Sequence, residues 1–376
     1  MRILNVVDGD RWTGSAAVVF DHTAALVAAG VEAQFGYFAG GRLADRLGAL
    51  GWTRPLFHRV RGPLGYAREI RRLRRLILRE KVDLVHAHRS YDHALAALAV
   101  RGTATRLART LHHVRAARPD PFLRRVYART DAFAYANDEI ARRFGRPGPI
   151  LSPVVDAQRF HPADAASGSR ERARPADQLV VGTVGKMSRG RGHEEAIRAA
   201  SQVPEIRLAH VGHGEHQSGL RRFAAARGAA DRNVFLGYQE EALPELYRSW
   251  DAFLFPASGA DQGQRAILEA MATGLPVLAV DVPGVRDLVT DGADGLVVGA
   301  PEQLSAALAR LAGDADLRRR LGRAARARAL EFTSERFAPR AIAFYESALR
   351  ETRERRPDGS SARPAGTPGG SGRRGR

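Results

Sequence analysis

The chain has 376 residues, enough for two domains of ordinary size, and 44% of them are hydrophobic. It contains no cysteine, which excludes disulfides, thiolate metal sites and cysteine nucleophiles. The net charge is +18, of which +12 falls in residues 1–165. Such a basic surplus predicts attraction to an anionic partner, either a phospholipid surface or a nucleic acid.

The start of the chain resembles neither an export signal nor a membrane anchor. Met1 leads directly into a strand-like run, and no apolar run approaches the length of a membrane span. We therefore expect a cytoplasmic protein. Its basic first half is compatible with peripheral association at the inner face of the plasma membrane.

The first half of the chain alternates strand-like and helix-like runs. Five apolar runs have the length of buried strands, and they occupy residues 3–7, 31–38, 83–88, 105–110 and 131–136. Between them, residues 13–30 carry an apolar helical face, and residues 65–81 place Ile70, Leu73 and Ile77 on one face and arginines on the other. This alternation predicts a parallel sheet covered on both faces.

The alternation stops after residues 1–160, the first expected domain, and then restarts. Residues 161–178 are polar, contain two prolines and predict a linker. Six further strand-like runs predict a second Rossmann-like domain over residues 179–335. A helix over residues 336–356 is expected to pack back toward the N-terminal domain, and residues 357–376 are expected to be disordered.

A glycine-rich stretch with three cations predicts an anion site. In open α/β sheets ligands bind beyond the carboxyl ends of strands, and GTVGKMSRGRGHEE (182–195) runs from a strand into a helical pattern. Its glycines would let backbone amides approach a phosphate, and Lys186 and Arg191 could bind a diphosphate. It matches neither the Walker loop nor the dinucleotide fingerprint. The alternative, a glycine-rich turn with solvated cations, stays open from this stretch alone.

Two carboxylates give a second signal, in DQGQRAILEAMATG. Asp261 closes a loop after a strand, and Glu269 lies eight residues later in a helix that begins near Gly263. Carboxylates at this position can accept hydrogen bonds from sugar or ribose hydroxyls. Carboxylates next to a basic loop fit a ligand that carries both hydroxyls and phosphates. The alternative is that Glu269 faces solvent on an ordinary helix.

Five segments together carry a family resemblance. They are TGSAAVVFDHTAALVAAGVEA, DLVHAHRS with RTLHHV, GTVGKMSRGRGHEEAIRAA, NVFLGYQEEALPELYRSWDAFLFPA and DQGQRAILEAMATGLPVLAVDVPGVRDLV. With them the chain resembles the family 4 retaining glycosyltransferases (glycosyl transferases group 1), nearly throughout to about residue 350. The resemblance implies the GT-B fold, an α/β architecture of two doubly wound, parallel-sheet, Rossmann-like domains that face a central cleft.

The resemblance implies a donor site on the C-terminal domain. Lys186 and Arg191 would bind the diphosphate, in the reverse of the family's usual order of Arg and then Lys. Gly237 and Tyr238 would flank the nucleotide base. Glu269 would hold the ribose hydroxyls.

Further roles follow from the same resemblance. Asp261 stands where the family has Glu and would contact the donor sugar with a side chain one methylene shorter. Gln262 replaces the glycine that usually follows, and Gly263 comes one place later in the amide cradle. His112 matches the histidine beside the reacting sugar. Gly14 matches the glycine that lets the N-terminal domain approach the phosphates.

The implied reaction is transfer of a sugar from a UDP-, GDP- or ADP-linked donor with retention of configuration. The catalytic residues would be His112, Asp261, Lys186 and Arg191. No carboxylate nucleophile follows from the motifs, which favours front-face attack with the leaving phosphate accepting the proton. We expect neither a cofactor nor a metal, because cations already neutralise the diphosphate.

The acceptor is expected on the N-terminal domain, as is usual in this fold. Residues 65–81 and 121–133 combine arginines with aromatic and aliphatic residues. This composition suits a glycan or lipid-linked acceptor at an anionic membrane surface. Each segment alone could equally be a solvated helix face. By resemblance, assembly of a bacterial surface polysaccharide or lipopolysaccharide is the leading context.

The sequence allows three other interpretations. His86, His88, Asp92 and His93 could belong to a metallohydrolase, although strand alternation does not bring all four together. A basic nucleic-acid-binding protein would explain the charge, but no helix-turn-helix, zinc-finger or RNP-like pattern supports it, and we expect no specific nucleic acid. A sugar-nucleotide epimerase of the same fold would consume the donor without an acceptor.

Overall fold

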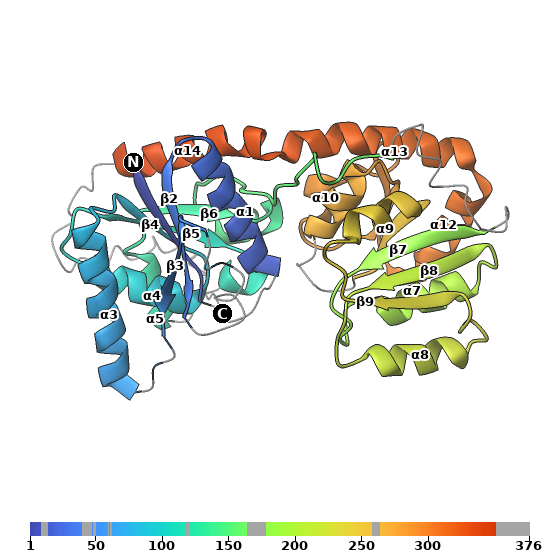
Figure 1. The fold of residues 1–376 in the computed structure, drawn as a ribbon, viewed down its shortest axis with the longest axis horizontal. Coiled ribbons are helices and arrows are strands. Elements are labelled where there is room, and N and C mark those ends of the chain that lie inside the picture. The colour runs from blue at the N-terminus through green and yellow to red at the C-terminus, as the bar shows by residue number, and fades with distance from the viewer. Residues whose placement is uncertain are drawn as a thin grey trace, which may run out of the picture.

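The computed structural model describes residues 1–8, 14–39, 47, 50–58, 60, 62–117, 121–163, 178–257 and 264–350, with only the backbone of residues 14, 15 and 122. Within these ranges strands and helices alternate and form two parallel sheets of six strands each (Figure 1). Most of the predicted linker at 161–178 and the whole predicted tail at 357–376 lie outside the described residues.

The first sheet belongs to the N-terminal domain. Its strands are β1 (Arg2–Val6), β2 (Glu32–Phe38), β3 (Thr53–Phe57), β4 (Leu84–Ala87), β5 (Arg106–Leu111) and β6 (Ala132–Tyr135). The helices in the described part of this domain are α1 (Gly14–Ala28), α3 (Gly62–Arg79), α4 (Ser90–Ala99), η1 (Val114–Ala117), α5 (Pro121–Tyr127) and α6 (Asp138–Phe144). The strand order is β3-β2-β1-β4-β5-β6, and the central strands are buried because helices cover both faces.

The second sheet repeats this arrangement in the C-terminal domain. Its strands are β7 (Leu179–Val184), β8 (Ile206–Val211), β9 (Asn233–Gly237), β10 (Ala252–Phe255), β11 (Val277–Val280) and β12 (Gly295–Val298). The helices are α7 (His193–Ser201), α8 (Gln217–Ala225), α9 (Leu243–Ser249), α10 (Gln264–Ala272), α11 (Val285–Leu288), η2 (Pro301–Gln303), α12 (Leu304–Gly313) and α13 (Ala315–Ala329). The order β12-β11-β10-β7-β8-β9 is, counted from its own first strand, the same doubly wound order as in the first sheet. The predicted fold class of two doubly wound parallel-sheet domains is confirmed.

Strand β3 was not predicted from the sequence. β3 has the sequence TRPLF and pairs only with β2, at the edge of the first sheet. Its proline and its single short apolar end hide it from a search for buried apolar runs. Proline is tolerated there because an edge strand leaves one row of backbone groups unpaired.

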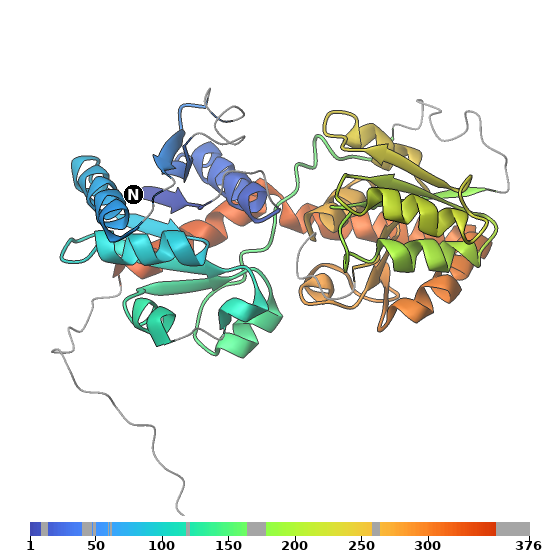
Figure 2. The ribbon, with the colours of Figure 1, turned by 90° about the horizontal axis from the view of Figure 1, so that it is seen from below.

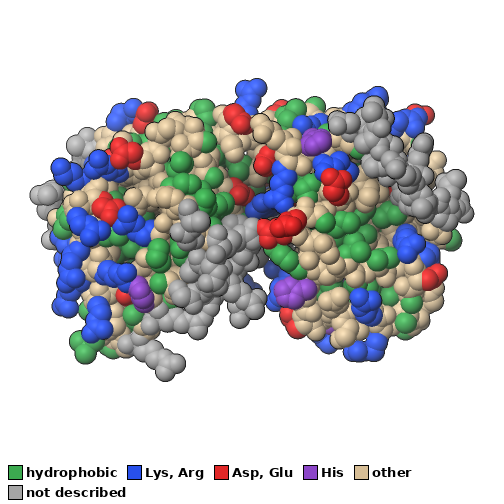
Figure 3. Space-filling model, viewed as in Figure 1, with side chains coloured by type: hydrophobic (Ala, Val, Ile, Leu, Met, Phe, Trp, Pro, Cys, Tyr) green, Lys and Arg blue, Asp and Glu red, His purple; other side chains and the backbone are tan. Residues whose placement is uncertain are grey.

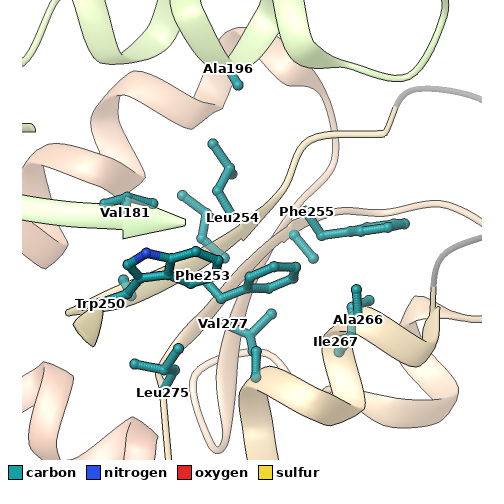
Figure 4. Packing of buried hydrophobic residues seen from close by; sticks show 14 of the residues in the cluster. Val181, Ala196, Trp250, Phe253, Leu254, Phe255, Ala266, Ile267, Leu275 and Val277 are labelled. Carbon is teal, nitrogen blue, oxygen red and sulfur yellow. The ribbon is translucent and has the colours of Figure 1, made fainter. Parts of the chain in front are cut away.

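The C-terminal domain has a mainly aliphatic core that also contains Trp250, Phe253 and Phe255 (Figure 4). Trp250 is 1% exposed and lies against β7, where a Cβ atom at Gly182 would come within 1.9 Å of its ring. Only glycine therefore fits at this position of the strand that leads into the predicted phosphate loop.

The last helices connect the two domains. The helix expected over residues 336–356 corresponds to α14 (Ser334–Arg350), which follows α13 and η3 (Leu330–Phe332), and residues 351–356 lie outside the described residues. Figures 1 and 2 show the domains side by side, with these helices running across both. In α14, Phe337, Phe344 and Tyr345 pack into a core cluster with Ile3 of β1 and Leu84 of β4. None of the helices in the described ranges combines the length and apolar character needed to cross a membrane.

Candidate functional site

The predicted phosphate loop connects β7 to α7, and its last residue must be glycine. Gly192, just before the helix, has φ of 80°, and a Cβ atom there would lie 1.8 Å from the carbonyl oxygen of Pro256. The loop thus packs directly against the exit of β10. This close approach holds the amino end of α7 at the carboxyl edge of the sheet, where its free amides favour an anion.

The two cations of the loop lie in different surroundings. Lys186 is 60% exposed, and its Nζ is 3.2 Å from Oε2 of Glu215 in the loop after β8. The pKa of Glu215 lies below its ordinary value, first because of its own backbone amide and then because of Lys186. Arg191 is half-buried, and its charge adds to burial in lowering the pKa of His193, at the start of α7, to about 4. The loop is thus cationic, with one cation paired to an exposed carboxylate.

Two exposed rings follow β8 and β9. Tyr238 is 60% exposed, and its ring centroid lies 6.4 Å from that of His213 in an edge-to-face arrangement. Gly237 has φ of 72°, and its carbonyl accepts a hydrogen bond of 2.8 Å from the amide of Gly212. This tight connection presents both rings at the carboxyl edge of the sheet, as a platform suited to a planar base.

Glu269 is held inside the protein rather than facing solvent. Its side chain is 8% exposed; Oε1 accepts a bond of 2.9 Å from Nε of Arg265, and Oε2 accepts one of 3.1 Å from the hydroxyl of Tyr247. Burial raises the pKa of Glu269, and Arg265 and Tyr247 counteract this shift. A carboxylate with two fixed donors keeps further lone pairs for the hydroxyls of a ligand.

The contacts of Arg265 continue into the other domain. Its Nη1 lies 3.1 Å from Oδ2 of Asp21 in α1. The Asp21–Arg265–Glu269 network therefore joins α1 of the N-terminal domain to α10 of the C-terminal domain. Sequence reasoning missed Arg265, although its spacing of four residues from Glu269 is that of a helical ion pair. Nothing in the sequence indicated Asp21.

His112 follows β5 and belongs to a buried chain of rings in the N-terminal domain. Its Nε2 is 3.1 Å from Nδ1 of His88, whose Nε2 is 3.3 Å from Oδ1 of Asn5. His86 lies beside His88 with its Nδ1 2.9 Å from the hydroxyl of Tyr345 in α14. Burial lowers the pKa of His112 well below its ordinary value, so the ring is a neutral hydrogen-bonding group.

Arg109 is a buried cation of β5, and sequence reasoning missed it. It is 2% exposed, its Nη1 is 3.7 Å from Oδ1 of Asp92, and its Nε and Nη1 make no hydrogen bond within the described part of the chain. Asp92 also accepts bonds from the backbone amides of His88 and Arg89. The charge of Arg109 adds to burial in lowering the pKa of His112.

The histidine-rich segment does not assemble a metal site. Among the residues described, no group of three or more His, Asp or Glu side chains is arranged to hold a metal ion. His86 and His88 lie side by side at β4, whereas Asp92 and His93 lie in α4. The ring of His93 packs on Tyr127, with a centroid distance of 5.3 Å.

The described candidates of the C-terminal domain follow neighbouring strands of one parallel sheet. Strands β10, β7, β8 and β9 are neighbours in that order, and the candidate residues follow three of them. Glu269 follows β10, Lys186 and Arg191 follow β7, and Gly237 with Tyr238 ends β9. Of the remaining candidates, Gly14 is the first residue of α1 and His112 contacts side chains of the first sheet, while Asp261 and Gly263 lie outside the described residues.

Two family models match this chain. The model described as Glycosyltransferase Family 4 matches residues 12–150, and that described as Glycosyl transferases group 1 matches residues 167–328. A D-inositol 3-phosphate glycosyltransferase of Nocardia farcinica is 34% identical over 54% of this chain and 48% of its own length. The matched region thus spans about half the length of such relatives. The lipopolysaccharide core biosynthesis mannosyltransferase LpsB of Rhizobium meliloti is 32% identical over 59% of this chain and 67% of its own length.

Solved structures share the architecture. A glycosyltransferase of Rickettsia africae superimposes with a TM-score of 0.80 at 16% identity, covering 93% of this chain and 99% of its own. HepE of Anabaena, solved in complex with UDP-glucose, gives 0.78 at 20% identity, covering 92% of this chain and all of its own. These similarities extend over both domains. The chain belongs to family 4 of the glycosyltransferases, the glycosyl transferases group 1, and has the GT-B fold.

Proposed function

We propose that the protein is a retaining glycosyltransferase that moves a sugar from a nucleotide-diphosphate sugar to a glycan or lipid-linked acceptor. The observation that carries this proposal is the shared edge of β10, β7, β8 and β9. After these strands come the buried carboxylate of Glu269, the cationic glycine loop and the exposed ring of Tyr238. In this proposal the three features would bind the ribose, the diphosphate and the base of a nucleotide sugar.

The leaving diphosphate is the centre of the proposed chemistry. Lys186, Arg191 and the amino end of α7 supply positive charge where negative charge develops as the sugar departs. Lys186 would exchange its exposed partner Glu215 for the diphosphate, at little cost because the pair is solvated. These cations support transfer without a metal.

The N-terminal domain would complete the site. Gly14 opens α1, which would bring its amino end to the phosphates. His112, kept neutral by burial, would bond to a hydroxyl at the reacting sugar, and Asp261 with Gly263 would contact the donor sugar. The motifs assign no residue, Asp261 included, as a nucleophile, so the proposed route is front-face attack with retention, in which the departing phosphate accepts the acceptor's proton.

The identities of the donor and of the acceptor are proposed from similarity to other glycosyltransferases. HepE is described in complexes with UDP and UDP-glucose, and a phosphatidylinositol monomannoside mannosyltransferase of Mycolicibacterium smegmatis, 35% identical over 44% of this chain, is named as GDP-mannose-dependent. We therefore propose a UDP-, GDP- or ADP-linked sugar as donor. The similarity to LpsB supports a role in bacterial surface polysaccharide or lipopolysaccharide assembly.

The first experiment is calorimetric titration with UDP, GDP, ADP and their sugars, with and without EDTA. Wild type should bind one diphosphate, unaffected by EDTA, and Lys186→Gln and Glu269→Gln should each weaken binding at least tenfold. The matched controls are Lys81→Gln, at the only other lysine, and Glu205→Gln, exposed at the opposite end of β8. Binding of no nucleotide by the folded protein would refute the donor site. Consumption of the sugar nucleotide without any acceptor would indicate an epimerase.

We also propose that α3 docks the enzyme on an anionic membrane surface. One face of α3 exposes arginines, namely Arg68, Arg71, Arg72, Arg75 and Arg79, and its start exposes Leu64 (86%) and Tyr66 (42%). Lys and Arg side chains gather along this flank of the domain in Figure 3. Clustered arginines with exposed apolar residues suit anionic lipid.

Co-sedimentation with vesicles tests this docking. Wild type should bind vesicles rich in phosphatidylglycerol, lose binding as salt rises, and ignore phosphatidylcholine. Replacing Arg71 and Arg75 by Glu should reduce binding at least tenfold, whereas the same change at Arg207 and Arg222, which are exposed on the other domain, should not. Equal binding by both double variants would refute α3 as the docking face.

A further inference from the structure

The guanidinium of Arg265 contacts carboxylates of both domains. It lies in the first turn of α10, with Nε bonded to Glu269 and Nη1 3.1 Å from Asp21 of α1. Its side chain is 31% exposed, and those of Asp21 and Glu269 are 22% and 8% exposed. One guanidinium thus bridges two largely buried carboxylates that belong to different domains.

The bridge fixes α1 relative to α10. Asp21 is seven residues after Gly14, so the amino end of α1 lies about 10 Å along the helix axis from the ion pair. A guanidinium binds two carboxylates only in a narrow range of orientations, because its donors form a rigid planar fork. Separation of the domains would break the Asp21 contact and leave the contact within α10 in place.

The two carboxylates bound by Arg265 belong to different domains and have different functions in the bridge. Glu269 is oriented by Arg265 and Tyr247, both in the C-terminal domain. Asp21 is the part of the network that moves with the N-terminal domain. Burial lowers the pKa of Arg265, but Asp21 and Glu269 more than offset this, and the guanidinium stays charged.

We propose that Arg265 is a positioning residue with two functions: it orients the Glu269 carboxylate, and through Asp21 it holds the two domains in the closed arrangement. Asp21 is the N-terminal half of this latch. The role of Glu269 in holding ribose rests on the proposed function, whereas the latch itself is an ion pair of the protein without ligand. Closure through this bridge would bring the amino end of α1 toward the donor diphosphate.

The absence of cysteine allows a direct measurement of the distance between the domains. Cysteines introduced at Arg75 in α3 and Arg222 in α8, both exposed, would carry spin labels for pulsed EPR. Without ligand, Asp21→Asn should broaden the distance distribution and shift its mean by several ångströms. Asp316→Asn, which removes an exposed ion-pair partner within α13, is the matched control and should leave the distribution unchanged.

A second readout separates the two ends of the latch. Asp21→Asn should leave nucleotide affinity within about threefold and lower kcat about tenfold, because closure is impaired while Glu269 stays oriented. Arg265→Ala should lower both nucleotide affinity and kcat, and Arg265→Lys should recover part of kcat. In the Arg265→Ala background, adding Asp21→Asn should lower neither quantity further. An unchanged distance distribution in Asp21→Asn would overturn the latch. Failure of wild type to bind any nucleotide would overturn the proposed function and leave the distance result standing.

Discussion

Acidification is expected to destabilise the protein through its buried neutral histidines, and His210 of β8 offers the clearest case. The ring is fully buried, stacks on Phe235 at 4.6 Å, and bonds to Asn233 at 3.0 Å. Burial is the main reason that the pKa of His210 falls to about 3. An unfolded histidine has a pKa near 6.5, so protons bind the unfolded chain first as the pH falls.

The sign and size of the effect follow from this difference. A lowered pKa in the fold contributes stability that is present above pH 6.5 and is lost as the pH falls toward 3. At pH 5 an unfolded histidine is almost fully protonated and His210 remains neutral, so the loss is about 2 kcal/mol for this one residue. Other buried histidines add to the total, among them His22 and His86.

A comparison of variants isolates the contribution of His210. His210→Gln does not titrate and retains an amide that can bond to Asn233. Urea unfolding followed by circular dichroism at pH 7.5 and pH 5.0 gives two free energies of unfolding for each protein. Wild type should lose about 2 kcal/mol more than the variant between these pH values. Equal losses by the two proteins would refute the assignment of a neutral buried imidazole.

Three further predictions concern other parts of the C-terminal domain. Gly192→Ala should cost roughly 2 kcal/mol of stability because its Cβ meets a backbone carbonyl, whereas Gly190→Ala, with open space around it, should cost about half as much by thermal unfolding. Tyr247→Phe removes a donor from the buried α10 carboxylate and raises the pKa of that group, so calorimetry should show a greater loss of nucleotide affinity at pH 6 than at pH 8. Arg326→Met leaves three backbone carbonyls without their donor and should cost about 2 kcal/mol, unlike Arg323→Met at an exposed neighbouring position.

Much of the fold could be predicted from the sequence because buried parallel strands leave a strong local pattern. Short apolar runs such as VLAV and AFLF are buried at every residue, and helical patterns separate them. β3 lacked this pattern because an edge strand with a proline needs fewer apolar residues. Strand order was accessible only through the resemblance, since periodicity carries no information on which strands pair.

The positions of candidate site residues could be predicted from the sequence only where those residues come after a strand. Lys186, Tyr238 and Glu269 could be placed at one edge because parallel strands end at the same side of a sheet. The partner of Arg265 was not accessible, because Asp21 lies far away in the sequence and no local rule joins them. Arg109 falls in the strand-like run at 105–110, and only the fold shows that it is buried beside Asp92.

The placement of α14 has a consequence for the order in which the chain is completed during synthesis. Tyr345 bonds to His86 across 259 positions, and Phe337 and Phe344 fill the same cluster of the N-terminal domain. That domain therefore emerges from the ribosome with one apolar face uncovered. Its own last strand ends at Tyr135, so roughly 200 further residues must be translated before α14 can cover this face, which takes about 10–40 s at ordinary rates of synthesis. The first domain to be made is thus the last to be finished, and during this interval it is a natural substrate for chaperones.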